Sequence, residues 1–317
     1  MINFKKVFLK DRNNKLAYYV KTILKSVLPY PYCRWRKDRL IRYYDKLDKA
    51  YIQSRVDYYN KLDTITSLSA DAIAVKDYKI PDKIRVYYFD SIEYLRYFDR
   101  HFKFEIIPGD VIHVPSCPAI VKSRPIHGDN VNSVLLNLDK ARHFNFIRDD
   151  IPFEKKKNLL VGRSGFSQPH RARFFDMYAQ HPLCDIKKAA RKSDPDFLSI
   201  PQHLNYKFIL ALEGNDVATN LKWIMSSNSI AVMPMPTYET WFMEGTLIPD
   251  YHFICIKHDY SDLEEKLNYY IEHPAEALRI VENAHSYVDQ FKDKKQEDII
   301  SLLVLEKYFK FTDQDKV

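Results

Sequence analysis

Residues 206–245 read YKFILALEGNDVATNLKWIMSSNSIAVMPMPTYETWFMEG and alternate between apolar runs and polar turns. The run 208–212 predicts a strand that ends in the polar turn 213–216. Thr219 can cap a following helix, and the apolar run 229–233 predicts a second strand. A strand, turn, helix and strand in this order are typical of open parallel sheets, whose ligands bind at the carboxyl ends of strands. The stretch therefore predicts an α/β fold with an anion site where the turn enters the helix.

The same residues resemble glycosyltransferase family 90, which contains lipopolysaccharide-modifying enzymes and protein O-glucosyltransferases. The similarity is greatest to the bacterial branch that builds lipopolysaccharide core. It continues through YETWFMEGTLIPDYHFICIK at 238–257, and upstream through NLLVGRSG at 158–165, QPHR at 168–171 and KSRP at 122–125. The motifs recur in the family's order over about residues 84–291, so the resemblance covers most of the chain.

The resemblance implies a GT-B architecture, in which two Rossmann-like domains face a cleft, with helical N- and C-terminal extensions. Apolar runs predict strands in the first domain at 84–89, 104–107 and 119–122, and Ser91 is expected to cap a helix. The charged segment 148–157 predicts the domain boundary. We expect an acceptor-side domain with a basic helical start at 1–150. A nucleotide-sugar donor domain should follow at 151–317, with its last helices able to return to the first domain.

Length, composition and cysteine spacing limit the class of protein. The chain has 317 residues, of which 46% are hydrophobic, enough for one large or two ordinary cores. No run of about 20 uncharged apolar residues occurs, and Lys21 and Lys25 interrupt the only apolar candidate for a signal peptide. The four cysteines lack C-x-x-C spacing, which argues against zinc and for reduced thiols. We therefore expect a cytoplasmic protein, and the family resemblance implies that neither a cofactor nor a metal is required.

Positive charge is concentrated at the start of the chain. Residues 1–65 contain 16 Lys and Arg and 6 Asp, a net charge of +10, whereas the whole chain has +7. Trp35 and many tyrosines lie in the same segment, a composition that suits the surface of an anionic bilayer. The alternative is a set of amphipathic helices whose tyrosines pack on the main domain.

The resemblance implies an inverting glycosyltransferase that moves a hexose, glucose or galactose, from a UDP-sugar to a lipopolysaccharide inner-core sugar. The expected partners are the UDP-hexose, the core glycolipid and, through residues 1–65, an anionic membrane. The enzyme would then be peripheral on the inner face of the inner membrane. Two alternatives stay open: a basic nucleic-acid-binding protein, suggested by a pI near 8.9, and an inactive family member that acts as a scaffold. No nucleic-acid motif supports the former.

An inverting transfer needs a base that removes the proton of the acceptor hydroxyl. Asp110, on a loop after a predicted strand, aligns with the family's catalytic aspartate when KSRP is the anchor. The alternative for Asp110 is an ordinary turn residue, and Asp129 in a polar turn is the second candidate base. No Asp-x-Asp pair lies in the donor stretch, since Asp194 and Asp196 belong to a separate loop.

Arginines and main-chain N–H groups are expected to hold the leaving diphosphate. Arg163 and Arg171 follow the strand predicted at 159–161, although solvated surface arginines are the alternative. Eukaryotic members have an arginine where Asn220 stands, and Lys222 can replace its charge. The donor-binding candidates are Gly162, Arg163, Ser164, Arg171, Glu213, Asn215, Asp216, Ala218, Thr219, Asn220 and Lys222.

A second group of candidates combines basic, acidic and aromatic side chains, which commonly bind sugars together. Two of its members belong to KSRP at 122–125, and three lie near the end of the stretch 206–245. For the acidic and aromatic members, the alternative is core aromatics beside solvated acids. The sugar or acceptor candidates are Lys122, Arg124, Glu239, Trp241 and Glu244.

Overall fold

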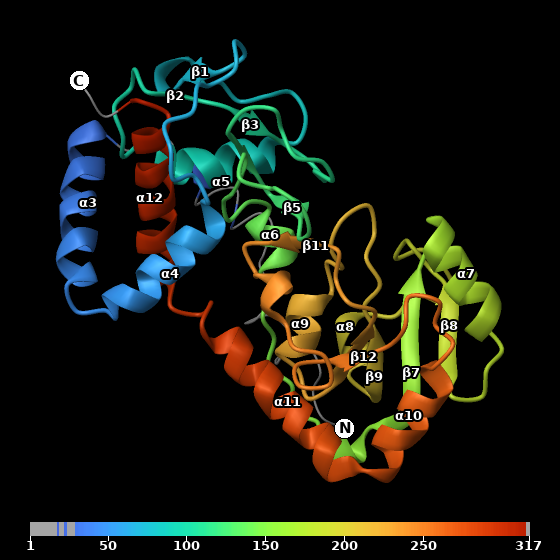
Figure 1. The fold of residues 1–317 in the computed structure, drawn as a ribbon. Coiled ribbons are helices and arrows are strands. Elements are labelled where there is room, and N and C mark those ends of the chain that lie inside the picture. Colours follow the sequence, from blue (N-terminus) through green and yellow to red (C-terminus); the bar gives the residue numbers. More distant parts are fainter. Residues whose placement is uncertain (1–17, 19–21, 24–28, 315–317) are drawn as a thin grey trace. The chain divides into compact units, whose positions relative to one another are not determined.

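The computed structural model describes residues 18, 22–23 and 29–314 (Figure 1). These residues belong to two compact units, which we call the sheet unit and the helical unit. The sheet unit contains residues 143–236 and 245–290. The helical unit contains the described residues up to Arg142, together with Thr237–Glu244 and the described residues from Phe291 onward. The chain therefore leaves and re-enters the helical unit twice.

A five-stranded parallel sheet forms the centre of the sheet unit. Its order is β12-β10-β9-β7-β8, so the chain starts at β7, adds β8 on one side and then crosses to β9 on the other. The point between β7 and β9, where the direction of growth reverses, is the place at which open α/β sheets bind ligands. The strands are β7 (Lys157–Ser164), β8 (Cys184–Lys188), β9 (Tyr206–Leu210), β10 (Ile230–Met233) and β12 (Ile254–Cys255).

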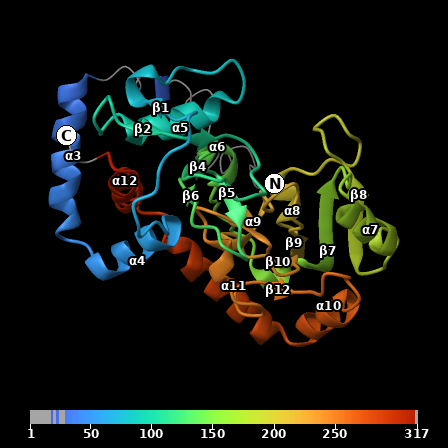
Figure 2. The same cartoon turned by 45° about the horizontal axis from the view of Figure 1, so that its top comes forward.

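Helices and a continuous apolar core surround this sheet. Leu160, Phe208 and Ile254 are completely buried in a cluster that also includes side chains of α10 and α11. Helix α7 contacts β8, and the two lie side by side in Figure 2. The helical segments are η2 (Phe153–Lys155), α7 (Pro169–Tyr178), α8 (Ile200–His203), α9 (Leu221–Met225), α10 (Leu263–Glu272) and α11 (Pro274–Asp289).

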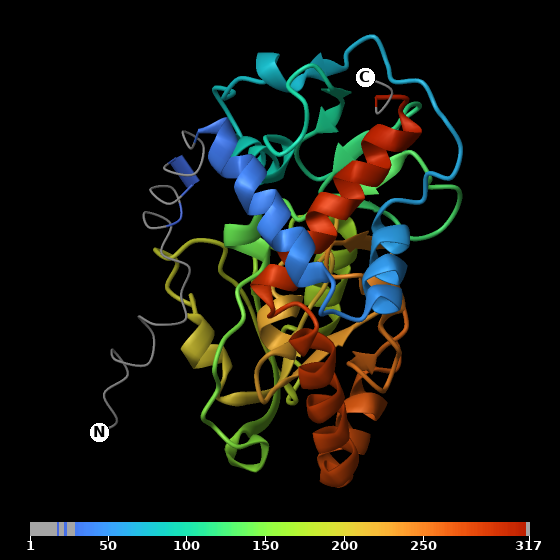
Figure 3. The same cartoon turned by 90° about the vertical axis from the view of Figure 1, so that its left-hand side faces the viewer.

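Long helices and short strands make up the helical unit. Helix α12 contacts α3, α4 and α5, and Figure 3 shows α3 beside α12. The strands form a parallel sheet of order β3-β4-β6 and two antiparallel pairs, β1 with β2 and β5 with β11.

The bounds of these elements are as follows. The helices are α3 (Tyr30–Tyr44), α4 (Lys49–Tyr59), α5 (Arg85–Leu95), α6 (Lys140–His143) and α12 (Lys294–Phe311), with short η1 (Val75–Asp77) and η3 (Glu244–Thr246) turns. The strands are β1 (Ile73–Ala74), β2 (Lys103–Phe104), β3 (Ile106–Ile107), β4 (Ala119–Val121), β5 (Ser123–Pro125), β6 (Ser133–Leu135) and β11 (Tyr238–Thr240). The protein is thus a mixed α/β structure with parallel sheets.

The predicted strand at 84–89 is wrong, because these residues begin α5. Ile84 precedes the helix in a left-handed conformation (φ 55). Ser91 does not cap a helix but lies inside α5, where its hydroxyl donates to the Tyr87 carbonyl at 2.7 Å. Most residues of α5 from Tyr87 onward are buried. A short apolar run of this kind has no period that separates a buried helix from a buried strand.

Within residues 29–314 and the three described residues before them, no helix combines the length and apolar composition that a membrane crossing requires.

Candidate functional site

The strongest candidate site lies at the switch point between β7 and β9. Strand β7 ends at Ser164, and a four-residue loop leads from it into the first turn of α7. In that loop Phe166 has a left-handed backbone (φ 47), and its N–H donates to the Ser164 hydroxyl at 2.9 Å. The loop after β9 contains Leu212, Glu213 and Gly214. Two loops that follow neighbouring parallel strands therefore meet at one edge of the sheet.

Arg171, in the first turn of α7, joins these two loops. Its Nε donates to the Glu213 carbonyl at 2.7 Å, and its Nη2 donates to the Leu212 carbonyl at 2.6 Å. Its Nη1 lies 3.4 Å from the Ser164 hydroxyl. A Cβ atom on Gly214 would lie 3.4 Å from Nη2, an ordinary contact distance, so the loop lies directly beside the guanidinium.

Within the part of the chain that the structure describes, Arg171 has no carboxylate among its hydrogen-bond partners. Two main-chain carbonyls and one hydroxyl hold it, and burial lowers the pKa of its guanidinium. Neutral partners orient the cation but leave its full charge uncompensated. An anion at the switch point would supply the missing negative charge.

Arg163, which lies on β7 itself, has different partners. Its Nη2 pairs with the Asp185 carboxylate at 2.7 Å, and its Nε donates to the Asp196 carbonyl at 2.8 Å. Asp185 also accepts a hydrogen bond from the Tyr206 hydroxyl. Burial opposes ionisation of Asp185, but the bonds from Tyr206 and Arg163 outweigh it and lower its pKa. The structure thus uses Arg163 to join β7, β8 and the loop at Asp196.

Gly162, the neighbour of Arg163, is closely covered by side chains of both adjacent strands. An added Cβ atom would lie 2.9 Å from the Ile186 side chain on β8 and 3.1 Å from the Leu210 side chain on β9. The glycine therefore lets the side chains of both neighbouring strands cover β7.

The remaining donor candidates belong to the loop and short helix after β9. Asn220 donates to the Leu210 carbonyl at 2.9 Å, and Gln168 donates to the Asn215 side chain at 3.4 Å. The main chain turns back at Asp216, whose carbonyl accepts from the Gly214 N–H at 2.9 Å. Thr219 does not cap a helix, because α9 begins at Leu221 and extends over only five residues, with Ala218 and Thr219 in the preceding turn. Lys222 is completely buried.

In the helical unit, Asp110 and Lys122 form an ion pair. The Lys122 ammonium lies 2.5 Å from the Asp110 carboxylate, and the side chains are 2% and 28% exposed. Lys122 directly follows the buried strand β4, which fixes its position. The second candidate base, Asp129, is exposed, and its carboxylate accepts from the Val131 N–H at 3.1 Å.

The other acceptor candidates are buried and bind protein groups. Arg124 pairs with Glu239 at 2.7 Å, where β5 lies beside β11. Trp241 stacks on Tyr59 with ring centroids 3.8 Å apart. The Glu244 carboxylate accepts from the Thr240 N–H and hydroxyl, closing the turn after β11.

Two comparisons with known proteins agree with each other. The model of the family described as glycosyl transferase family 90 matches residues 153–315. The chain is also 40% identical over 304 residues to the O-glucosyltransferase LpsA of Dichelobacter nodosus. The matched region covers 93% of this chain and 95% of the relative. The chain belongs to glycosyltransferase family 90.

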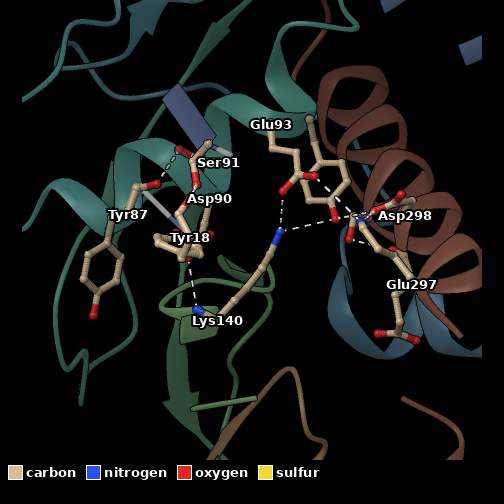
Figure 4. Close-up of polar contacts among 12 residues, drawn as sticks. Tyr18, Tyr87, Asp90, Ser91, Glu93, Lys140, Glu297 and Asp298 are labelled. Carbon is tan, nitrogen blue, oxygen red and sulfur yellow. Dashed lines mark hydrogen bonds and ion pairs between the residues drawn. The ribbon is translucent and has the colours of Figure 1, made fainter. Parts of the chain in front are cut away.

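This family 90 glycosyltransferase also contains a buried ionic cluster that we did not predict. Lys140 donates to Glu93 at 3.1 Å and approaches the Tyr94 hydroxyl at 3.3 Å, and Tyr94 donates to Asp298 at 2.9 Å (Figure 4). The Asp90 carboxylate accepts from the Lys140 N–H at 3.0 Å. These residues connect α5, α6 and α12, and the signal that could have indicated them is the i, i+3 spacing of two acids on α5.

Proposed function

We propose that this glycosyltransferase transfers glucose from UDP-glucose to a hydroxyl of a lipopolysaccharide inner-core sugar, with inversion at the anomeric carbon. The observation that carries the proposal is the uncompensated charge of Arg171 at the switch point of a parallel sheet. The name of the relative, O-glucosyltransferase LpsA, supports glucose and a lipopolysaccharide acceptor. Galactose is the second candidate sugar.

On the donor side, the diphosphate of UDP-glucose would lie against Arg171. A guanidinium whose Nε and Nη2 are fixed by carbonyls can still present an edge to phosphate oxygens, and a charge-assisted bond there is stronger than a neutral one. Main-chain N–H groups of the two loops would add neutral donors, as they do at other phosphate sites. Arg163 would support this arrangement through β8 rather than touch the phosphate.

On the acceptor side, Asp110 would be the general base. The acceptor hydroxyl gives its proton to the Asp110 carboxylate while its oxygen bonds to the anomeric carbon. The bond from that carbon to the UDP oxygen breaks, and UDP leaves with the electron pair. Lys122 would orient the carboxylate through their ion pair, so that one oxygen is held and the carboxylate keeps a defined direction.

The proposal includes a GT-B architecture and no required metal. Arg171 would supply the positive charge that a divalent ion provides in metal-dependent transferases. Activity should therefore persist after treatment with EDTA. Complete loss of activity that Mn²⁺ alone restores would contradict this part of the proposal.

The direct test is a donor screen with purified protein and lipopolysaccharide that lacks the outer core. UDP-glucose, UDP-galactose and UDP-N-acetylglucosamine are offered separately, and the mass of the acceptor is measured. We expect a gain of one hexose with UDP-glucose and a much slower gain with Asp110→Asn. A hexose gain with UDP-galactose alone would change the sugar, and no gain with any donor would overturn the proposal.

The acceptor is part of a glycolipid, so the enzyme should also work at a membrane surface. We place it, within the same proposal, on the inner face of the inner membrane as a peripheral protein.

A further inference from the structure

Helix α3 carries aromatic and basic side chains on one exposed face. Tyr32, Trp35, Arg39 and Arg42 are spaced by three or four residues, so they follow one side of the helix. Trp35 is 49% exposed and Tyr32 is 40% exposed, which is unusual for large aromatic side chains. The Tyr32 and Trp35 rings lie 5.6 Å apart, and the Arg39 guanidinium lies 5.7 Å from the Trp35 ring.

The opposite face of α3 attaches the helix to the helical unit. Cys33 and Leu40 are buried, and Arg36 pairs with the buried Asp298 at 3.1 Å. The Lys37 ammonium lies 4.8 Å from the centre of the Phe98 ring. Arg36 and Lys37 are thus used within the fold, whereas Arg39 and Arg42 point to solvent. The sequence alone does not separate these two pairs of cations.

The exposed face extends beyond α3. Tyr43, one turn after Arg39, lies under the ammonium of Lys295 from the start of α12, 4.8 Å from the ring centre. Acidic residues occur in the same region: Asp38 lies on α3, the Asp45 carboxylate pairs with Lys49 at 2.9 Å, and the Asp293 carboxylate caps the main chain of α12. Two of these three acids are engaged by protein groups, whereas Arg39 and Arg42 are exposed.

We propose that the α3 surface, defined by Tyr32, Trp35, Arg39, Arg42, Tyr43 and Lys295, docks on an anionic lipid bilayer. Tyrosine and tryptophan rings have an apolar body and a polar edge that suit the headgroup region, and arginines bind lipid phosphates. The inference deepens the proposed function, since it names the surface that would bring the enzyme to a glycolipid acceptor.

A second copy of the chain fits this surface less well. A two-fold dimer pairs the same patch on both copies, so it would bring the arginines of one α3 close to those of the other. An anionic bilayer has the opposite charge, and each arginine near such a surface contributes favourably. Charge complementarity therefore selects the bilayer.

The first test measures binding of the full-length protein to vesicles by sedimentation, without any UDP-sugar. Vesicles of phosphatidylglycerol and phosphatidylcholine are compared with vesicles of phosphatidylcholine alone. We expect Arg39→Gln with Arg42→Gln to weaken binding to the anionic vesicles about 30-fold, from about 1 kcal/mol per arginine. The matched control is Lys155→Gln with Arg279→Gln, two exposed cations of the sheet unit, which should change binding less than about twofold.

The second test uses tryptophan fluorescence, because Trp35 is far more exposed than the buried Trp241. Anionic vesicles should shift the emission of the wild type to shorter wavelength. Trp35→Phe should lose that shift and still sediment with the vesicles, since phenylalanine keeps the apolar contact.

Equal vesicle binding by the double arginine variant and its control would overturn the inference, as would a fluorescence shift that survives Trp35→Phe. A dimer that dissociates in the arginine variant, without vesicle binding by the wild type, would assign the surface to a second copy instead. Because no donor or acceptor is present, these outcomes are independent of the donor screen.

Discussion

Arg55 in the helical unit and Arg171 in the sheet unit are both largely withdrawn from solvent, but their partners differ in charge. Arg55 contacts both oxygens of the Glu297 carboxylate, at 2.6 and 3.2 Å, and donates to the Tyr59 hydroxyl. Arg171 is held by two carbonyls and a hydroxyl. The positive charge of Arg55 is thus neutralised within the fold, whereas that of Arg171 is not.

The same difference separates other side chains of the two units. In the helical unit, Arg124 pairs with Glu239 and Arg36 with Asp298, so these arginines stabilise contacts between elements. In the sheet unit, Arg163 has Asp185 as its partner, which leaves Arg171 as the distinctive cation at the switch point. The partner's charge, rather than burial alone, therefore distinguishes an arginine that stabilises the fold from one suited to bind an anion.

The largest effect is expected at Asp110. Its ion pair with Lys122 lies in the helical unit, but we assign this pair to the reaction and not to stabilisation of the fold. Asp110→Asn should reduce turnover by about 10² to 10⁴-fold and leave UDP binding nearly unchanged, because a general base contributes to the reaction step. Steady-state kinetics and calorimetry with UDP measure the two effects. Asp129→Asn is the matched control, and a larger loss in that variant would move the role of base to Asp129.

Removing Arg55 should destabilise the protein strongly. Arg55→Met leaves Glu297 buried without its cation, a change that costs about 3–5 kcal/mol. Unfolding in urea measures the loss, and Arg148→Met, which removes the exposed pair with Asp150, should cost less than about 1 kcal/mol. Equal losses in the two variants would show that burial of the Arg55 pair has no energetic consequence.

Asp90 should make stability depend on pH. Burial is the main cause that raises the pKa of Asp90 to about 6 in the folded protein, from an ordinary value of 3.8. The folded state then binds this proton more tightly than the unfolded state, so the contribution of Asp90 to stability is fully present below about pH 4 and is lost as pH rises through 6. The loss amounts to about 3 kcal/mol. Asp90→Asn should flatten this part of the stability curve, and an unchanged slope would contradict the assignment.

The smallest expected effect is on binding of UDP. Arg171→Ala should weaken UDP by about 1.5–3 kcal/mol, the range of a charge-assisted contact, and should affect uridine far less. Arg163→Ala should instead lower the free energy of unfolding and change the difference between UDP and uridine little. If Arg163→Ala produced the larger UDP-specific loss, Arg163 and not Arg171 would be the diphosphate ligand.

The sequence allowed good prediction of the sheet unit. Strand β10 is a continuous apolar run between turns and β9 is apolar apart from Lys207, which is close to the pattern of a strand buried on both faces. The helical unit was harder to predict. Tyrosine and phenylalanine favour strands by propensity, but in α5 contacts on several sides of the helix override that preference.

The type of a residue also predicted its role in the site less well than its position in the folded protein did. Both Arg163 and Arg171 follow the strand predicted at 159–161, and the contact of Arg163 with Asp185, 22 residues away, becomes visible only in the fold. Lys222 was expected as a possible replacement for a phosphate-binding arginine, and its burial became visible only in three dimensions. Such contacts between distant residues have no signature in a single sequence.

The path of the chain between the units has a consequence for synthesis on the ribosome. The last strand of the five-stranded sheet ends at Cys255, whereas Arg55 meets its partner Glu297 only 242 residues later. The helical unit contains most of the first half of the chain, but it is therefore the last unit that can be completed. Until α12 emerges, Arg55 and the apolar residues that α12 covers lie in a nascent chain without their partner. Translation would finish the sheet first, and the early helices would depend on chaperones or on rapid release.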